Sequence, residues 1–358
     1  METMTAILSP YLWIMLLLIG LILPYERGGE RVRVIIGWAL LNLFVLFFGL
    51  RGDTGNDYAA YQHFYYHVLE PGALHYEPAF TALAMLLRAL HLPFQCFVFL
   101  CSCIINGLLF CFIWRRQLNM PLVLCVFWGM SGIAGELDFT RSTIATMLFV
   151  NALAFLEQRQ AGRYFALVGL ACLFHYAALL YLPLYFVLHR RMERHHYLTA
   201  VLVLMVLGLL RLRFLDFPIE LMGTGGEDSL VAHYQQYVTR FGGIQLAFTI
   251  AAAERLLTAA LVVMCYERLS ATAQGRMAAN GFLAFYLCYT LLAGYAVMAT
   301  RLAHLFVWSY WLLWPMLLAA VGNVWLKRTL AGGMTVYLTA RVWSVSVMGK
   351  LAYVSCFH

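Results

Sequence analysis

The apolar stretch IIGWALLNLFVLFFGL, residues 35–50, is followed at once by RGDTGNDYAAYQHFYYHVLEP, residues 51–71. As a helix rising about 1.5 Å per residue, the first stretch is long enough to cross most of a bilayer. The second places charged residues, glycines and a series of aromatic residues at the point where that helix would leave the membrane. This junction predicts a membrane helix that opens into a polar, aromatic segment.

The composition of the whole chain extends this prediction. Of 358 residues, 63% are hydrophobic and only 11% are charged, which is too little polar surface to cover a soluble globule. The weak alternating pattern of a membrane barrel does not occur. The fold class expected is therefore all-α, a polytopic transmembrane helical bundle.

The net charge and the cysteines argue against nucleic-acid binding, a disulfide framework and a metal site. The net charge of +7 is expected from short cytoplasmic loops, which collect Arg and Lys, so nucleic acid is not an expected partner. The nine cysteines lie almost wholly in apolar runs without the spacing of metal ligands. Neither a disulfide framework nor a metal site is predicted.

The distribution of basic residues predicts the path of the chain across the membrane. Segments 76–92 and 164–188 are ambiguous, and they are resolved by requiring all basic connections to lie on one side. Segment 76–92 then becomes an interfacial or re-entrant helix, and 164–188 becomes a bent pair that turns near His175. The prediction is about eleven spans, with the N-terminus outside and the C-terminus inside. The clear spans are 6–25, 34–50, 94–114, 120–137, 142–157, 197–213, 246–265, 277–297 and 303–321.

This topology gives one transmembrane catalytic domain, residues 1–328, and a C-terminal tail, residues 329–358, that is compatible with an interfacial helix. The predicted outer elements are 51–93, 138–141, 214–245 and 298–302. The outer face is where the polar residues without a topological explanation gather, so a functional site is expected there.

The opening stretch offers a candidate surface for sugars. Asp57, Tyr61, Phe64 and Tyr65 recur at helical spacing, so a short helix is predicted to begin around Asp57. An aromatic face with an acid at its start is typical of sugar-binding surfaces, although an interfacial aromatic belt would look the same. For Arg51, a structural ion pair with Asp57 at the end of the span is as good an interpretation as a role in binding a ligand.

Three further outer segments carry ionisable residues. One short turn contains Glu136, Asp138 and Arg141, where either acid could pair with the arginine. His175 lies in an apolar segment and is either a hydrogen-bonded core residue or a proton acceptor. Arg301 ends a span and is followed by His304, and the long loop 214–245, a lid or acceptor-binding element, contains Arg240.

Arginines that converge on one outer cavity suggest a polyanionic ligand, because guanidinium groups bind phosphate oxygens bidentately. The sequence has no paired carboxylates of the DxD kind, no Walker loop and no GxSxG motif. Metal-dependent transfer from nucleotide sugars, ATP use and serine hydrolysis are therefore disfavoured. A substrate that already carries an activated phosphate, presented from the lipid, fits better.

Several motifs together resemble a known family. They are Arg51-x3-Gly55-x-Asp57-x3-Tyr61, YEPAF (76–80), TRSTIATMLFVNAL (140–153) with Arg141, ACLFHYAALLYLPLY (171–185) with His175, and TRLAHLF (300–306) with Arg301. In this order they resemble the EpsG-like branch of Wzy-type polysaccharide polymerases over roughly residues 30–320. Two departures are Ser142, where the family usually has Gln, and the tail, which matches no part of the pattern.

The resemblance implies an inner-membrane, metal-independent glycosyltransferase that needs no cofactor and builds O-antigen, capsule or exopolysaccharide. Its donor and acceptor would both be undecaprenyl-pyrophosphate-linked oligosaccharides, used at the periplasmic face beside membrane lipid. A chain-length regulator is a further partner that the family suggests. A transporter or flippase of lipid-linked oligosaccharides, and an O-antigen ligase, are the alternatives.

The same resemblance assigns roles to individual residues. Arg141 would stabilise the leaving pyrophosphate, and the acceptor proton would go to Asp57, the first choice, or to His175 or Glu77. Anomeric inversion is expected from a single displacement. The catalytic candidates are Asp57, His175 and Arg141, and the substrate-binding candidates are Arg51, Arg301, Tyr61, Glu77, Tyr58, His304 and Arg240.

Overall fold

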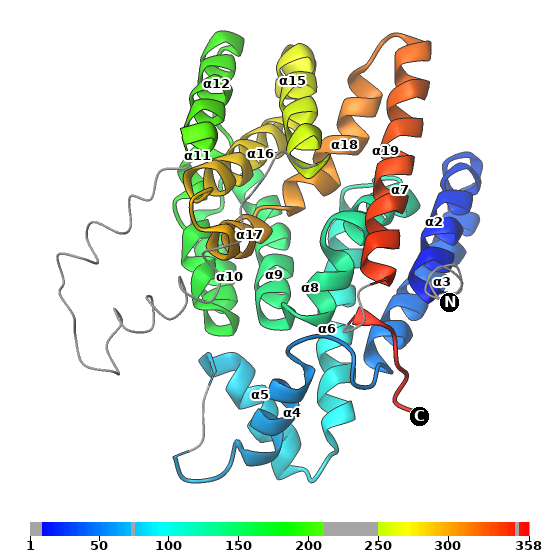
Figure 1. Ribbon diagram of the computed structural model, residues 1–358, viewed down its shortest axis with the longest axis vertical. Helices are drawn as coiled ribbons and strands as arrows, with labels where there is room; N and C mark the ends of the chain where they lie inside the picture. Colours follow the sequence, from blue (N-terminus) through cyan, green and yellow to red (C-terminus); the bar gives the residue numbers. More distant parts are fainter. Residues whose placement is uncertain (1–8, 73–75, 211–249, 348–350, 358) are drawn as a thin grey trace, which may run out of the picture. The chain divides into compact units, whose positions relative to one another are not determined.

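The computed structural model describes residues 9–72, 76–210, 250–347 and 351–357, and over these residues the chain is helical (Figure 1). It divides into two compact units, Met1–Val187 with Tyr310–His358, and Leu188–Ser309. The described residues contain no strand, only an isolated antiparallel bridge between Arg51 and Ser355. The prediction of an all-α fold is thus confirmed.

The first unit is an array of helices of very different lengths. They are α2 (Pro10–Arg27), α3 (Glu30–Gly49), α4 (Tyr58–His67), α5 (Pro78–Ala89), α6 (Phe94–Arg115), α7 (Met120–Phe127), the π-helical η1 (Trp128–Gly132), α8 (Ile133–Leu137), α9 (Thr140–Glu157), α10 (Ala161–Phe174), the 3-10 helix η2 (Tyr176–Tyr181), α11 (Leu184–Val187), α18 (Trp308–Ala320, which begins in the second unit) and α19 (Val324–Ser346). Helix α9 is central, because 14 of its 18 residues are buried and it packs on both α6 and α10. A helix that is buried on all sides lies in the core of its unit.

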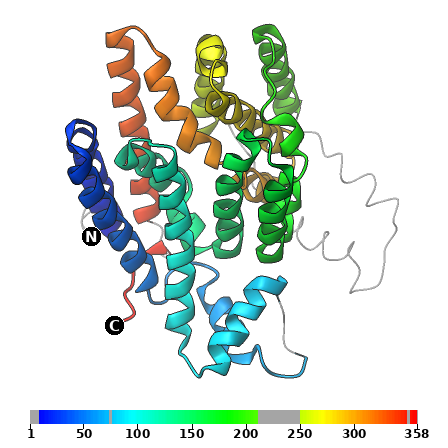
Figure 2. The same ribbon diagram turned by 180° about the vertical axis from the view of Figure 1, so that it is seen from behind.

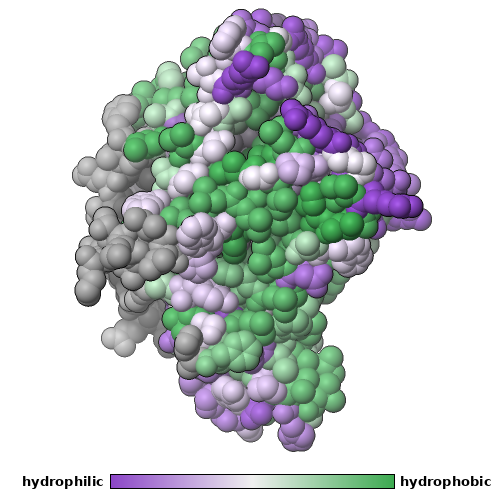
Figure 3. Space-filling model, turned by 90° about the vertical axis from the view of Figure 1, so that its right-hand side faces the viewer, coloured by the Kyte–Doolittle hydropathy of each residue, from purple (hydrophilic) through white to green (hydrophobic). Residues whose placement is uncertain are grey.

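Four of the described helical segments are long and apolar enough to cross a membrane: α2, α3, α6 and the continuous segment Met120–Leu137. A fifth is counted if the bent pair Met298–His304 and Trp308–Ala320 is one span. Helices α2 and α3 also expose large apolar side chains, and Figure 3 shows a wide apolar area on one face. These features fit a helical membrane protein, and the count of about eleven spans stays a prediction.

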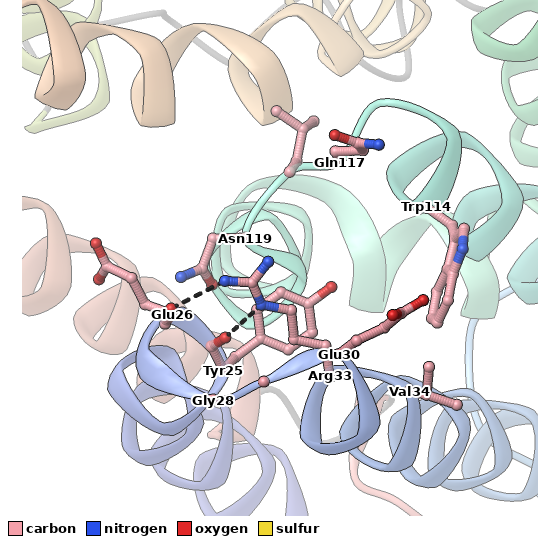
Figure 4. Close-up of a pocket in the computed structure, with 11 residues that line it drawn as sticks. Tyr25, Glu26, Gly28, Glu30, Arg33, Val34, Trp114, Gln117 and Asn119 are labelled. Atoms are coloured by element: carbon pink, nitrogen blue, oxygen red, sulfur yellow. Dashed lines mark hydrogen bonds between the residues drawn. The ribbon is translucent and has the colours of Figure 1, made fainter.

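Three basic connections lie together at one end of the first unit. Connections 26–33 and 114–117 line the same open pocket, of about 630 Å³, which is shown in Figure 4. Arg116 pairs with Glu157 at 2.7 Å, just before the connection 159–163. The opposite end carries α4 and α5, seen from behind in Figure 2. The expected clustering of basic connections is therefore confirmed within this unit.

The predicted reversal at His175 is also confirmed. Helix α10 ends at Phe174, and the chain then runs back along it as η2. The Tyr164 hydroxyl, near the start of α10, donates to the Tyr181 carbonyl at 2.6 Å, which fixes the returning segment. Helix α5 is only 12 residues long, too short to span, and whether it lies at the membrane interface stays a prediction.

The prediction of a C-terminus on the side opposite to loop 51–93 is wrong. The 23 residues of α19 extend about 35 Å, and Leu338 and Val342 are buried where the helix packs on α2 and η1. Beyond α19, residues 351–356 lie beside residues 50–54. The charged residues of α19 hide this helix from a search for apolar runs, which is why the sequence did not reveal it as a crossing of the unit.

The second unit consists of α12 (Arg194–Leu210), α15 (Ile250–Ser270), α16 (Ala273–Leu291) and α17 (Ala296–His304). Helix α16 contacts the other three. The Asn280 side chain on α16 donates to the carbonyls of Leu188 and Arg190, and Arg191 pairs with Glu267 at 2.7 Å. The basic connections 189–196 and 267–276 thus lie together within this unit, as the topology requires.

Candidate functional site

Glu77 joins three segments that are far apart in the sequence. It occupies the N-cap position of α5, ahead of Pro78, and is 5% exposed. One carboxylate oxygen accepts from Arg141 Nη1 at 2.5 Å, and the other lies 2.9 Å from His175 Nδ1. The backbone N–H of Tyr176 also donates to the second oxygen, at 3.4 Å. Three residues predicted separately as site residues, Glu77, Arg141 and His175, are thereby brought together.

Arg141 is held on several sides and remains partly open. It is the second residue of α9, and its guanidinium lies over the ring of Tyr76, 4.1 Å from the ring centroid. Its Nε donates to the hydroxyl of Tyr61 at 3.4 Å. The side chain is nonetheless 23% exposed. A guanidinium oriented by a carboxylate and an aromatic face, with an accessible edge, is suited to binding an anion.

The electrostatics of Glu77 follow from these contacts. Burial alone would raise the pKa of Glu77, but the hydrogen bonds from His175 and Arg141, together with the Arg141 charge, outweigh it and lower the pKa to about 2. At neutral pH the carboxylate is ionised and can only accept hydrogen bonds. His175 Nδ1 must therefore carry a proton, so a neutral His175 ring has its lone pair on Nε2.

The aromatic face of α4 is turned into the protein. The helix begins at Tyr58 with Asp57 as its N-cap residue, as predicted, but Tyr58, Tyr61, Phe64 and Tyr65 are all buried. These rings pack against rings of α5 and α6. The face is thus a packing surface, and neither a sugar platform nor an interfacial belt describes it.

Tyr61 and Asp57 nevertheless belong to the surroundings of Arg141. Burial is the main reason that the pKa of Tyr61 rises to about 12, and the Asp57 carboxylate contributes to the rise. Burial, again with a contribution from Asp57, raises the pKa of Tyr76. Tyr61 therefore stays protonated at neutral pH. Tyr58 packs on Phe94 instead, with its ring centroid 5.9 Å from the Arg51 guanidinium.

Arg51 makes its contacts inside the protein. It is 4% exposed, and its Nη1 donates to the carbonyls of Leu137 at 3.0 Å and Thr54 at 3.3 Å. Burial lowers the pKa of Arg51, and the nearby carboxylates of Glu136 and Asp138 oppose this effect. In this structure Arg51 connects loop 50–57 to the turn before α9, which is a structural contact rather than an exposed anion site.

The acids of the 136–138 turn do not pair with Arg141, contrary to one reading of the sequence. The Asp138 carboxylate accepts from the backbone N–H of Asn56 at 2.5 Å and from Asn56 Nδ2 at 2.9 Å. Glu136 accepts from Asn106 Nδ2 at 3.1 Å. Arg141 turns the other way, to Glu77, because the two acids are already engaged by loop 50–57 and by α6.

Gly55 permits the loop to approach this turn. Its φ is +104°, and a Cβ atom placed there would lie 2.9 Å from both Asp138 Oδ1 and the Leu137 carbonyl. Only a residue without a side chain suits both the conformation and the space. The backbone conformation and the close contacts therefore explain why the Arg51-x3-Gly55-x-Asp57 motif has glycine at position 55.

The remaining predicted residues lie elsewhere. Arg301 and His304 are on α17, in the second unit, and Arg301 is exposed. Arg240 lies outside the described residues. Sequence reasoning missed Tyr76 as the ring beneath Arg141, although it directly precedes Glu77 in YEPAF. It also missed Asn56 as the partner of Asp138.

One group of potential metal ligands occurs in the second unit. Glu193, His195 and His196 place ligand atoms within 4.8 Å of one another, and all three are exposed. Arg191 and Arg194 are close in sequence, and their positive charge opposes the binding of a cation. This group belongs to the second unit, whereas the Glu77 cluster belongs to the first.

Comparison with known proteins identifies the family. A model of the EpsG family matches residues 34–355, which is nearly the whole chain and includes most of the tail beyond residue 328. No curated protein and no solved structure matches the chain. The chain therefore belongs to the EpsG family of EpsG-like polysaccharide polymerases.

Proposed function

We propose that this protein joins lipid-pyrophosphate-linked oligosaccharide repeat units into a surface polysaccharide. The observation that carries the proposal is the Glu77 carboxylate, which bridges a partly exposed guanidinium, Arg141, and an imidazole, His175, in a member of the EpsG family. Undecaprenyl pyrophosphate is the lipid carrier we expect, on both donor and acceptor.

Arg141 would bind the pyrophosphate of the donor. Glu77 and the Tyr76 ring fix the guanidinium in place, so little reorganisation is needed when negative charge develops on the departing pyrophosphate. Preorganised donors of this kind are worth about a hundredfold or more in rate. The sequence has no paired-carboxylate motif for a metal, and a guanidinium can supply the positive charge instead.

His175 becomes the favoured proton acceptor. A carboxylate with a pKa of about 2 is a weak base, so Glu77 is better suited to orient His175 than to take the proton itself. An acceptor hydroxyl attacks the anomeric carbon, its proton passes to His175 Nε2, and the bond from that carbon to the pyrophosphate oxygen breaks. The pyrophosphate leaves with the electron pair, and the single displacement inverts the anomeric carbon. Asp57, our first choice from the sequence, would then contribute only through its negative charge near Tyr61.

The two ends of the first unit support the orientation that we propose for the protein in the membrane. The basic connections 26–33, 114–117 and 159–163 lie at the end away from the Glu77 cluster. Basic connections usually face the cytoplasm, which supports a cluster that faces the periplasm in a bacterial inner membrane. Arg301, His304 and Arg240 are proposed as further contacts to the lipid-linked substrates.

The test is complementation of a polymerase-deleted strain, followed by a gel of the surface polysaccharide. Arg141→Ala should lower long polymer about a hundredfold or more and leave single-repeat product, while Arg163→Ala, at the basic end, should behave as wild type. Full-length polymer from Arg141→Ala would contradict the proposal. Loss of all surface product would indicate a flippase, and polymer that is made but not attached would indicate a ligase.

A further inference from the structure

The C-terminal segment, residues 351–356, is paired through its backbone with the loop that follows α3. The Gly52 N–H donates to the Val354 carbonyl at 2.8 Å, and the Cys356 N–H donates to the Leu50 carbonyl at 2.9 Å. These two bonds flank the antiparallel bridge between Arg51 and Ser355. Figure 1 shows this red segment beside the end of α3.

Side chains secure the same pairing. Thr54 is fully buried, and its hydroxyl accepts from the Val354 N–H at 3.0 Å. The Tyr353 ring stacks on Phe47 with centroids 4.3 Å apart, and its hydroxyl donates to the Phe47 carbonyl at 2.9 Å. The Tyr11 hydroxyl donates to the Leu351 carbonyl at 2.8 Å. The segment is therefore held along its length.

Gly52 shows how closely the two backbones approach. A Cβ atom at this position would lie 2.8 Å from the Ser355 carbonyl oxygen. Only glycine allows this approach without a shift of the backbone. The loop thus carries two glycines for two separate reasons, one facing the C-terminal segment and one, Gly55, facing Asp138.

The other side of the loop is joined to the candidate site. Arg51 donates to the Leu137 carbonyl, and Asn56 donates to the Asp138 carboxylate. Residues 137–138 lead directly into α9, whose second residue is Arg141. At its far end the loop continues into α4, which carries Tyr61. Loop 50–57 is thus fixed between the C-terminal segment and the residues that position Arg141.

We propose that residues 351–356 are a positioning element for the Arg141 site. Their pairing sets the conformation of loop 50–57, which in turn sets the turn before α9 and the start of α4. For its activity readout, this inference rests on the proposed polymerase function. None of the residues in the segment touches substrate; they act through the loop.

The first experiment tests the placement without any assay of activity. Residues 50 and 356 oppose one another across the pairing, and opposed residues of an antiparallel pair lie about 5 Å apart between Cα atoms, within reach of a disulfide. In Leu50→Cys, membranes treated with an oxidant or a short bis-maleimide should yield linked peptides containing residues 50 and 356, identified by mass spectrometry. Leu50→Cys with Cys356→Ser is the control. Absence of the linked peptide would overturn the proposal.

The second experiment tests positioning. Val354→Pro removes the N–H that bonds to Thr54, whereas Val354→Ala keeps it. At equal amounts in the membrane, Val354→Pro should lower the rate of polymer formation about 10- to 100-fold, and Val354→Ala should match wild type. Cys356→Pro and Cys356→Ala form a second matched pair, because the Cys356 N–H bonds to Leu50.

Rescue separates positioning from a general loss of structure. Cross-linking residues 50 and 356 in Val354→Pro with Leu50→Cys should restore polymer formation, and reduction of the disulfide should abolish it again. Wild-type rates in Val354→Pro, or no rescue in the cross-linked protein, would overturn the positioning role. A wild-type chain that forms no polymer would overturn the proposed function, while the cross-link would still decide whether the segment holds the loop.

Discussion

Glu77 positions two neighbouring side chains: it holds Arg141 by charge and His175 by hydrogen bonding. Glu77→Gln retains the size of the side chain and removes the charge. We expect long polymer to fall about a hundredfold, because Arg141 is no longer preoriented and the tautomer of His175 is no longer fixed. Polymer synthesis at equal membrane content measures this. Glu157→Gln, which breaks the ion pair with Arg116 at the basic end, is the matched control.

The lowered pKa of Glu77 also predicts how stability depends on pH. A carboxyl whose pKa is lower in the folded state stabilises the fold above its unfolded pKa, near 4.5, and this contribution is lost as the pH falls toward about 2. The difference in thermal midpoint between wild type and Glu77→Gln in detergent should therefore be constant from pH 5 to 8 and shrink below about pH 4.5. A difference that stays constant down to about pH 2 would contradict the lowered pKa of Glu77.

Gly55 offers a test of the loop at a single position. Gly55→Ala introduces a side chain at a positive φ, against Asp138 and the Leu137 carbonyl, and should destabilise the fold by about 1 to 3 kcal/mol. Gly107→Ala, in α6, has open space around its Cβ and should be neutral or slightly stabilising. Thermal unfolding in detergent compares the two. Equal effects would contradict the requirement for glycine at position 55.

Among the elements, those with a local signal could be predicted. The helical spacing of aromatic residues after Asp57 gave the start of α4, and the charge rule gave the reversal at His175. The partners of Arg141 could not be predicted, because Asp138 lies nearby in the sequence whereas Glu77 is 64 residues away. The pairing of residues 351–356 is made largely by backbone groups, which leave no pattern of side chains to detect.

One side-chain amide on helix α16 binds the connection that precedes α12. Asn280 Nδ2 donates to the carbonyls of Leu188 and Arg190 at 2.9 and 2.8 Å. Asn280→Ala would leave both carbonyls without this donor, so we expect a loss of about 1 to 3 kcal/mol. A lower thermal midpoint in detergent would show it, whereas Asn42→Ala, at an exposed site, should change little. No change in Asn280→Ala would mean that other groups hold connection 189–196.

For the molecule as a whole, the two ends of the first unit predict which residues face the same compartment. Phe357 is 79% exposed and follows the segment beside loop 50–54, whereas Gln117 lies at the basic end. In a Cys356→Ser background, a membrane-impermeant maleimide should label Phe357→Cys from the periplasm, and Gln117→Cys only after the membrane is permeabilised. Labelling of both from one side would contradict the arrangement.

The pairing of the C-terminal segment has a consequence for biosynthesis. Thr54 and Val354 are separated by 300 residues, so the ribosome makes the loop long before it makes the partner of that loop. During translation, α3 can insert while residues 50–54 still have no backbone partner from the tail. A nascent or prematurely terminated chain can therefore be inserted in the membrane and yet lack the finished loop. Completion of the Arg141 site would therefore wait until residues 351–356 have been made.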